Sequence, residues 1–163
     1  MLAAGIDVGQ HAIKVVVLGT EGPLASGTHV NELDSDSGAL QALGAVLAGT
    51  GIALEDVGAV ASTGLGRKEV SFAQVRKTQE TCAARGAFHR FRRPCTVLDG
   101  GAGGCRAVRV GPGGKVLGFA ANSKCASGTG AFLEVACEVL RIDLRRLDQL
   151  AGAASEVAKV STT

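Results

Sequence analysis

Short apolar runs alternate with glycine-containing turns along the N-terminal part of the chain. In the run at 13–18, Ile13, Val15 and Val17 occupy every second position, which is the period of a strand with one buried face. Residues 8–12 separate this run from an earlier apolar one and predict a hairpin-like turn. The pattern therefore predicts three strands, over residues 2–7, 13–18 and 26–31.

The spacing changes from strand to helix after the acidic run 34–37. Leu40, Leu43 and Leu47 recur at the period of one helix face, and Gly49 marks its end. Aspartate and serine are favoured N-caps, so the acidic run indicates the helix start. The same reasoning predicts, in order, a strand at 57–62, a helix at 79–88, and strands at 95–99, 106–110 and 115–121.

An amphipathic stretch near the C-terminal end of the chain follows a turn of small residues at 126–130. Its apolar positions fall at i, i+1, i+4, i+7 and i+8, which is one face of a helix. Ser127 and Thr129 are natural caps for the first turn of this helix. The apolar positions are Phe132, Leu133, Ala136, Val139 and Leu140.

The two halves of the chain begin alike. In each half a strand ends in an aspartate, a glycine turn follows, and another strand comes next. The repeated segments are Asp7–Gly9 and Asp99–Gly101. Such a repeat predicts two related lobes with a ligand cleft between them. We place the first lobe at 1–93 and a partial second lobe at 94–163, whose last residues resemble the start of a strand.

Two glycine turns that face one another can surround phosphate oxygens with backbone N–H groups. An aspartate at the end of each preceding strand can hold Mg²⁺ through water and orient an attacking water, as phosphoryl transfer requires. Lys14 could direct a cation toward the phosphates. The alternative is that the glycines only form tight hairpins, with Asp7 and Asp99 as turn formers. The P-loop pattern GxxxxGK[ST] and a strand–turn–helix with GxGxxG are both absent from the sequence.

Composition and charge narrow the class of protein. Hydrophobic residues make up 46% and charged residues 20%, which is typical of a soluble globular protein, and the formal net charge is +2. This charge gives no reason to expect nucleic acid or an anionic membrane as a partner. No apolar run approaches the roughly 20 residues of a membrane span, and the N-terminus lacks the charged lead of a signal peptide. We therefore expect a cytoplasmic protein.

Cys125 stands in the small-residue turn immediately before the last predicted helix. The N–H groups and dipole at a helix start favour a thiolate, which is either a nucleophile or a soft-metal ligand such as those of iron–sulfur clusters. The alternative is a small buried residue. The odd total of 5 cysteines argues against structural disulfides, and the sequence has no CxxC zinc pattern.

Four stretches of the sequence together resemble the BadF/BadG/BcrA/BcrD ATPase family, which includes activators of 2-hydroxyacyl-CoA dehydratases and ATPase subunits of benzoyl-CoA reductase. The stretch around Cys125 is the most specific of the four, and their order strengthens the match. The stretches are 5–9 with Lys14, 61–67, 97–102, and 124–130 with Phe132, Leu133 and Glu134.

The resemblance implies an α/β protein with the actin/hexokinase-like (ribonuclease H-like) ATPase fold, the first lobe complete and the second truncated. It also implies ATP and Mg²⁺ as ligands, and a homodimer or a pair of related subunits that share one [4Fe-4S] cluster. ATP hydrolysis then lets the cluster pass a low-potential electron to a 2-hydroxyacyl-CoA dehydratase or a benzoyl-CoA reductase-type partner. Reduced ferredoxin or flavodoxin is the expected electron donor.

The resemblance also assigns residues to these roles. Asp7 and Asp99 are the predicted catalytic aspartates, and Cys125 matches the first cluster cysteine. The predicted nucleotide-binding residues are Gly9, Gln10, His11, Lys14, Gly100, Gly101 and Ala102.

Three departures from the family pattern matter. Gln10 and His11 stand where the family usually has Ser or Thr. The second glycine motif lacks the Gln-Asp of the activators and is closer to the benzoyl-CoA reductase subunits. The family's second cluster cysteine follows a segment similar to 160–163, where this chain ends, so we expect the N-terminal portion of a longer activator.

The alternatives are a small-molecule kinase of the same superfamily and an inactive remnant that only binds a partner.

Overall fold

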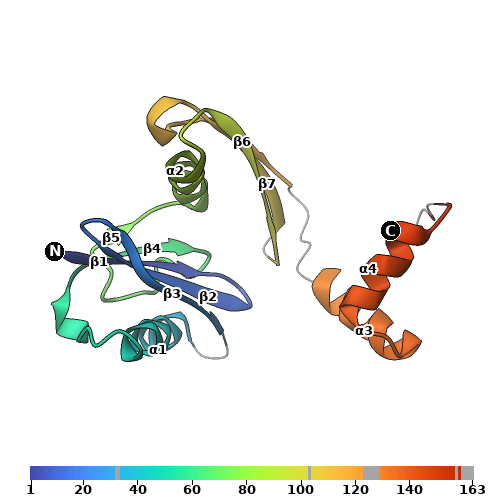
Figure 1. Ribbon diagram of the computed structural model, residues 1–163, viewed down its shortest axis with the longest axis horizontal. Coiled ribbons are helices and arrows are strands. Elements are labelled where there is room, and N and C mark those ends of the chain that lie inside the picture. The colour runs from blue at the N-terminus through green and yellow to red at the C-terminus, as the bar shows by residue number, and fades with distance from the viewer. Residues whose placement is uncertain (32–33, 103, 123–128, 157, 159–163) are drawn as a thin grey trace. The chain divides into compact units, whose positions relative to one another are not determined.

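The computed structural model describes the chain except for residues 32–33, 103, 123–128, 157 and 159–163. The chain forms two compact units, Met1–Ala126 and Ser127–Thr163, each of which is described by itself. The two lobes predicted at 1–93 and 94–163 stay a prediction. Figure 1 shows the elements of both units.

A five-stranded mixed sheet forms the N-terminal half of the first unit, in the order β3-β2-β1-β4-β5. The first three strands pair antiparallel, whereas β1 pairs parallel with β4, and β4 with β5. The predicted strands are confirmed and run slightly longer, and the short β5 is an addition. The strands are β1 Leu2–Val8, β2 Ala12–Gly19, β3 Gly22–Val30, β4 Val57–Gly64 and β5 Val75–Arg76.

Helix α1 (Ser35–Ala48) packs on one face of this sheet and confirms the predicted helix. Its N-cap is Asp34, whose Oδ1 accepts hydrogen bonds from the backbone N–H groups of Asp36 and Ser37 at 3.1 and 3.0 Å. Every second residue of β1 and β2 is buried against the helix. The core contains Ala4, Ile6, Val8, Ile13, Val15, Val17, Ala39, Ala42, Leu43, Val46 and Leu47, among others. Strand alternation therefore places Asp7 on the opposite face.

A three-stranded antiparallel sheet follows, in the order β6-β7-β8. Its strands are β6 Cys95–Gly101, β7 Gly104–Val110 and β8 Val116–Ala121, close to the predicted ranges. Short 3-10 turns at Leu54–Asp56 (η1) and Pro112–Gly114 (η2) precede β4 and β8.

Helix α2 (Gln79–Phe91) connects the two sheets along the chain and packs on the second one (Figure 1). Ala84 is fully buried with Val108 and Val110 of β7, and Phe88 packs against them. The Arg85 guanidinium donates a hydrogen bond of 2.7 Å to the carbonyl of Gly113 in η2. The helix therefore reaches from its capped start at Thr78 to the far turn of the second sheet.

The second unit contains helices α3 (Thr129–Leu140) and α4 (Leu144–Ala153). The predicted helix is confirmed by α3, whereas α4 is an addition. Arg141 ends α3 in the left-handed conformation (φ 55°), and Ile142 N–H donates to the Cys137 carbonyl at 3.0 Å. Asp143 then caps α4. Among the residues with a described placement, no helix is both long and apolar enough to cross a membrane.

Candidate functional site

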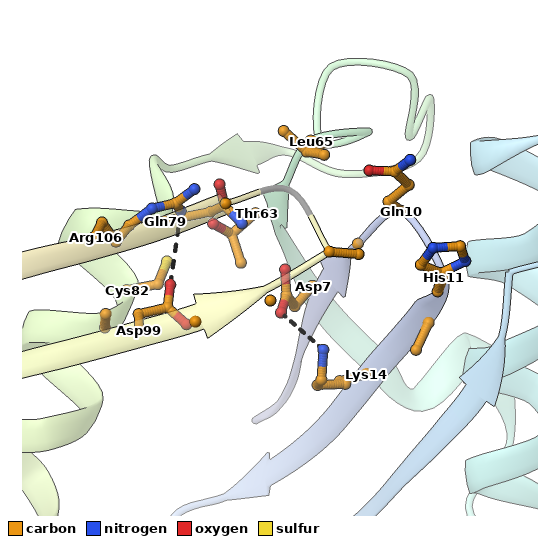
Figure 2. A pocket seen from close by; sticks show the side chains of 17 residues that line it. Asp7, Gln10, His11, Lys14, Thr63, Leu65, Gln79, Cys82, Asp99 and Arg106 are labelled. Carbon is orange, nitrogen blue, oxygen red and sulfur yellow. Dashed lines mark ion pairs between the residues drawn. The ribbon is translucent and has the colours of Figure 1, made fainter. Parts of the chain in front are cut away.

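A cavity of about 400 Å³ opens between the ends of β1 and β4, the turn after β1, the start of α2, and the β6–β7 hairpin. Figure 2 shows the side chains around it. The cavity brings together all of the predicted catalytic and nucleotide-binding residues, from both halves of the first unit. They are Asp7, Gly9, Gln10, His11, Lys14, Asp99, Gly100, Gly101 and Ala102. Cys125 lies outside the described residues.

Asp7 is the first carboxylate of the cavity. It pairs across the β1–β2 hairpin with Lys14, whose Nζ lies 3.6 Å from Asp7 Oδ2 (Figure 2). The other oxygen, Oδ1, is shut off from solvent and has no hydrogen-bond partner within the described part of the chain. A buried carboxylate oxygen without a donor is costly unless a cation or a water reaches it. Asp7 is therefore suited to bind an ion or an ordered water.

Thr63 lies directly beside Asp7, in register on the parallel strand β4. It lines the cavity, and its hydroxyl oxygen is likewise buried with no hydrogen-bond partner among the described residues. The sequence analysis gave Thr63 no role of its own, although it belongs to one of the four matching stretches. Parallel strands end at the same edge of a sheet, and this rule could have identified it.

The turn after β1 is held rigidly. Gly9 N–H donates to the Ala12 carbonyl at 3.0 Å, and the Asn31 side-chain amide donates to the Gly9 carbonyl at 2.8 Å. A side chain at Gly9 would place its Cβ 2.8 Å from the Ala12 carbonyl oxygen. The turn leaves Gln10 and His11 exposed at the mouth of the cavity, where either can donate a hydrogen bond to a ligand.

Asp99 is the second carboxylate, at the end of β6. Arg106, directly opposite on β7, holds its Nη1 3.7 Å from Asp99 Oδ2 and its Nε 3.9 Å from Oε1 of Glu80 on α2. Figure 2 shows the first of these pairs. Partial burial by itself raises the pKa of Glu80. The net shift of this pKa is nevertheless downward, because the carboxylate accepts hydrogen bonds from its own backbone N–H and the Thr78 hydroxyl and lies near the charges of Arg106 and Arg67.

The two hairpins carry the same arrangement. In each, an aspartate faces a cation on the neighbouring antiparallel strand, Asp7 with Lys14 and Asp99 with Arg106. Each cation also follows its aspartate by the same interval in the sequence. Two carboxylates, two cations and glycine backbone around one cavity have the chemistry to hold a phosphate group accompanied by a divalent metal. The sequence analysis missed Arg106, although the equal spacing was visible.

No group of three or more His, Cys, Asp or Glu side chains within the described ranges is arranged to hold a metal by itself. The described cysteines are unpaired thiols, namely Cys82, Cys95, Cys105 and Cys137. Cys82 lines the cavity, and Cys137 is buried in the second unit. The cavity offers carboxylate oxygens as possible metal ligands, and oxygen ligands are those that Mg²⁺ prefers.

The sequence matches the model of the BadF/BadG/BcrA/BcrD ATPase family over residues 4–163. Among curated relatives, the activator of lactoyl-CoA dehydratase from Anaerotignum propionicum is 32% identical over 163 residues, which are 100% of this chain and 63% of the relative. The chain spans about three fifths of the length of the curated relatives it matches.

Two solved structures agree with the fold. Component A of (R)-2-hydroxyglutaryl-CoA dehydratase from Acidaminococcus fermentans gives a TM-score of 0.83 at 27% identity, with 99% of this chain and 62% of that chain covered. The 2-hydroxyisocaproyl-CoA dehydratase activator from Clostridium difficile, solved with bound ADPNP, gives a TM-score of 0.82 at 30% identity. The match covers 99% of this chain and 60% of that chain. They confirm the predicted α/β actin/hexokinase-like fold.

Proposed function

Because the chain belongs to the BadF/BadG/BcrA/BcrD ATPase family, we propose that its cavity binds MgATP and that the protein is an ATP-dependent activator of a CoA-thioester dehydratase or reductase. The observation that carries the proposal is the pair of aspartates from two similar hairpins in one cavity, each beside a cation. The ADPNP bound to the similar activator from C. difficile supports a nucleotide as the ligand.

The residues have distinct roles in this proposal. Asp7 and Asp99 hold Mg²⁺ through water and orient the water that attacks the terminal phosphorus. Lys14 balances the negative charge of the phosphate oxygens, and the backbone N–H groups of Gly100 and Gly101 donate hydrogen bonds to them. The N–H of Gly9 is bonded to the Ala12 carbonyl, so Gly9 contributes by letting the turn approach the phosphates without a side chain. In the reaction, a bond forms between the water oxygen and the γ-phosphorus, and the bond from that phosphorus to the bridging oxygen breaks. ADP and inorganic phosphate leave, and the proton of the attacking water is released to solvent. Gln10 and His11 donate hydrogen bonds where relatives have hydroxyl groups.

Electron transfer is the second part of the proposal. A [4Fe-4S] cluster, held by Cys125, a second cysteine of the same subunit and the two corresponding cysteines of a second subunit, would supply the low-potential electron for the CoA-thioester enzyme. Reduced ferredoxin or flavodoxin would replace that electron. The support is the resemblance around Cys125 and the helix α3 that follows it, since a helix start favours thiolate over thiol.

Nucleotide binding is tested by calorimetric titration of the purified chain with MgATP and with Mg–ADPNP. We expect both to bind, and we expect binding to weaken when Mg²⁺ is removed by chelation because Asp7 and Asp99 then repel the phosphates. Circular dichroism first establishes that the chain is folded. A folded chain that binds neither nucleotide contradicts the proposed function.

The cluster is tested separately, by iron and acid-labile sulfide analysis of a full-length form of the protein that also contains the second cluster cysteine, purified without oxygen. We expect the wild-type protein to contain both elements and Cys125→Ser to lose them, with the fold retained. Cys105→Ser is the matched control, since Cys105 is an exposed thiol at the cavity hairpin. Iron retained in Cys125→Ser at the wild-type level, or iron-free wild-type protein, contradicts the assignment of Cys125.

A further inference from the structure

The guanidinium of Arg106 lies almost buried between two carboxylates. Its side chain is only 11% exposed, and its Nη1 atom is shut off from solvent with no hydrogen-bond partner among the residues whose placement is described. It belongs to β7 and lines the cavity together with Asp7, Lys14 and Asp99. The described residues therefore leave this N–H group without an acceptor.

The neighbouring carboxylates do not satisfy Arg106. Its separations from Asp99 and Glu80, 3.7 and 3.9 Å, exceed the 2.7–3.2 Å typical of an N–H···O hydrogen bond. They balance its charge without using its N–H groups. A buried guanidinium donor without an acceptor is a costly arrangement, so an acceptor inside the cavity would relieve it.

Arg106 also takes the position that Lys14 takes in the first hairpin, directly opposite an aspartate and seven positions after it in the sequence. Lys14 is 58% exposed, so its ammonium is a solvated point charge. Arg106 is desolvated and carries a planar fork of donors that matches two oxygens of one phosphate. The two side chains therefore differ in how strongly they can bind a phosphate group, although their positions in the two hairpins correspond.

We propose that Arg106 is a phosphate-binding residue of this cavity and that its guanidinium donates hydrogen bonds to the phosphate chain of the bound nucleotide. The proposal rests on the proposed nucleotide-binding function and adds a ligand contact to it. Asp99 and Glu80 hold the guanidinium at the cavity wall before the ligand enters. The phosphate chain enters as its Mg²⁺ complex, so the carboxylates meet the metal rather than bare phosphate oxygens.

The test uses a ligand without a base, inorganic tripolyphosphate with Mg²⁺, titrated into the chain by calorimetry. This probe reports on the phosphate contacts alone. We expect Arg106→Gln to raise its Kd about ten- to a hundredfold, the value of one or two charged hydrogen bonds. Arg106→Lys keeps the charge but loses the fork, and we expect a smaller rise, about three- to tenfold.

Arg109→Gln is the matched control, because Arg109 is exposed on the opposite face of the same strand. We expect its Kd to stay within about twofold of wild type, as for a surface charge outside the site. If Arg106→Gln does not fold, as judged by circular dichroism, the proposal is tested by comparing the tripolyphosphate Kd of Arg106→Lys with that of Arg109→Gln.

The outcomes separate this inference from the function on which it rests. If wild-type protein binds tripolyphosphate and MgATP, and Arg106→Gln and Arg106→Lys bind tripolyphosphate as wild type does, the Arg106 contact is wrong and the nucleotide site stands. If folded wild-type protein binds neither ligand, the nucleotide site itself is wrong, and the inference falls with it.

Discussion

Replacing Gly64 by alanine is expected to lower the free energy of unfolding by about 3 kcal/mol, because it combines left-handed backbone strain with overpacking. Gly64 ends β4 at φ +92°, and a Cβ there would overlap the Val8 carbonyl and lie 2.7 Å from Asp7 Oδ1. The substitution therefore strains the backbone and also pushes against the first carboxylate of the cavity. Urea denaturation measures the first effect, and MgATP titration of the folded variant measures the second.

Gly44→Ala is the matched control, because it makes the same change in an exposed position of α1 with open space around the new Cβ. A glycine inside a helix costs conformational entropy, so we expect this variant to be more stable by about 0.5–1 kcal/mol. Gly64→Ala with a stability equal to wild type would show that the β1–β4 edge can open, and would contradict the close packing of Gly64 on Asp7.

In a full-length form of the protein, replacing Asp7 by asparagine is expected to lower the rate of MgATP hydrolysis by about 10²- to 10⁴-fold, the range for loss of one positioned acid–base or metal-orienting group. The 163-residue chain alone is expected to be inactive as an ATPase. Asparagine has nearly the same size, so the fold is retained, but the negative charge that attracts Mg²⁺ and polarises its water is lost. Steady-state phosphate release measures the rate. Titration with ADPNP, with and without Mg²⁺, measures the loss of the metal's contribution to binding.

Asp148→Asn controls for the chemical change, since Asp148 is exposed on α4 in the second unit. We expect Asp148→Asn to hydrolyse MgATP at the wild-type rate, and we expect the iron content of both Asp148→Asn and Asp7→Asn to be unchanged. A wild-type rate of hydrolysis in Asp7→Asn would mean that the glycine turns do not serve the phosphates as proposed.

Much of the first sheet could be predicted because apolar residues occupy every second position along β1 and β2. Ile13, Val15 and Val17 alternate on β2 and are all buried, and the following helix shows a clear leucine spacing. The predicted cavity residues of each sheet lie next to the turn of a hairpin, and both hairpins border the same cavity. The repeated aspartate–glycine pattern predicted this meeting of the two halves, because related halves place a ligand between them.

What the sequence analysis missed depends on pairing rather than on local pattern. Arg106 can be placed opposite Asp99 only when the register of β6 and β7 is known. Thr63 can be placed beside Asp7 only when the parallel pairing of β1 and β4 is known. Helix α4 was missed for a different reason. Leu144, Leu147 and Leu150 follow a helical period, but no helix was predicted beyond Leu140, although Asp143 is a favoured N-cap for a new one.

Helix α2 has a mechanical consequence. At its start Glu80 pairs with Arg106 on the cavity wall, and in its middle Ala84 is locked into the second core. Arg85 ties the same helix to the backbone of Gly113. A helix of 13 residues is a stiff rod of about 20 Å. Glu80 and Arg85 lie five residues apart on this helix, so the cavity wall and the η2 turn are fixed to the same stretch of it. A spectroscopic label at η2 is therefore the place to look for a shift of α2 when the cavity is filled.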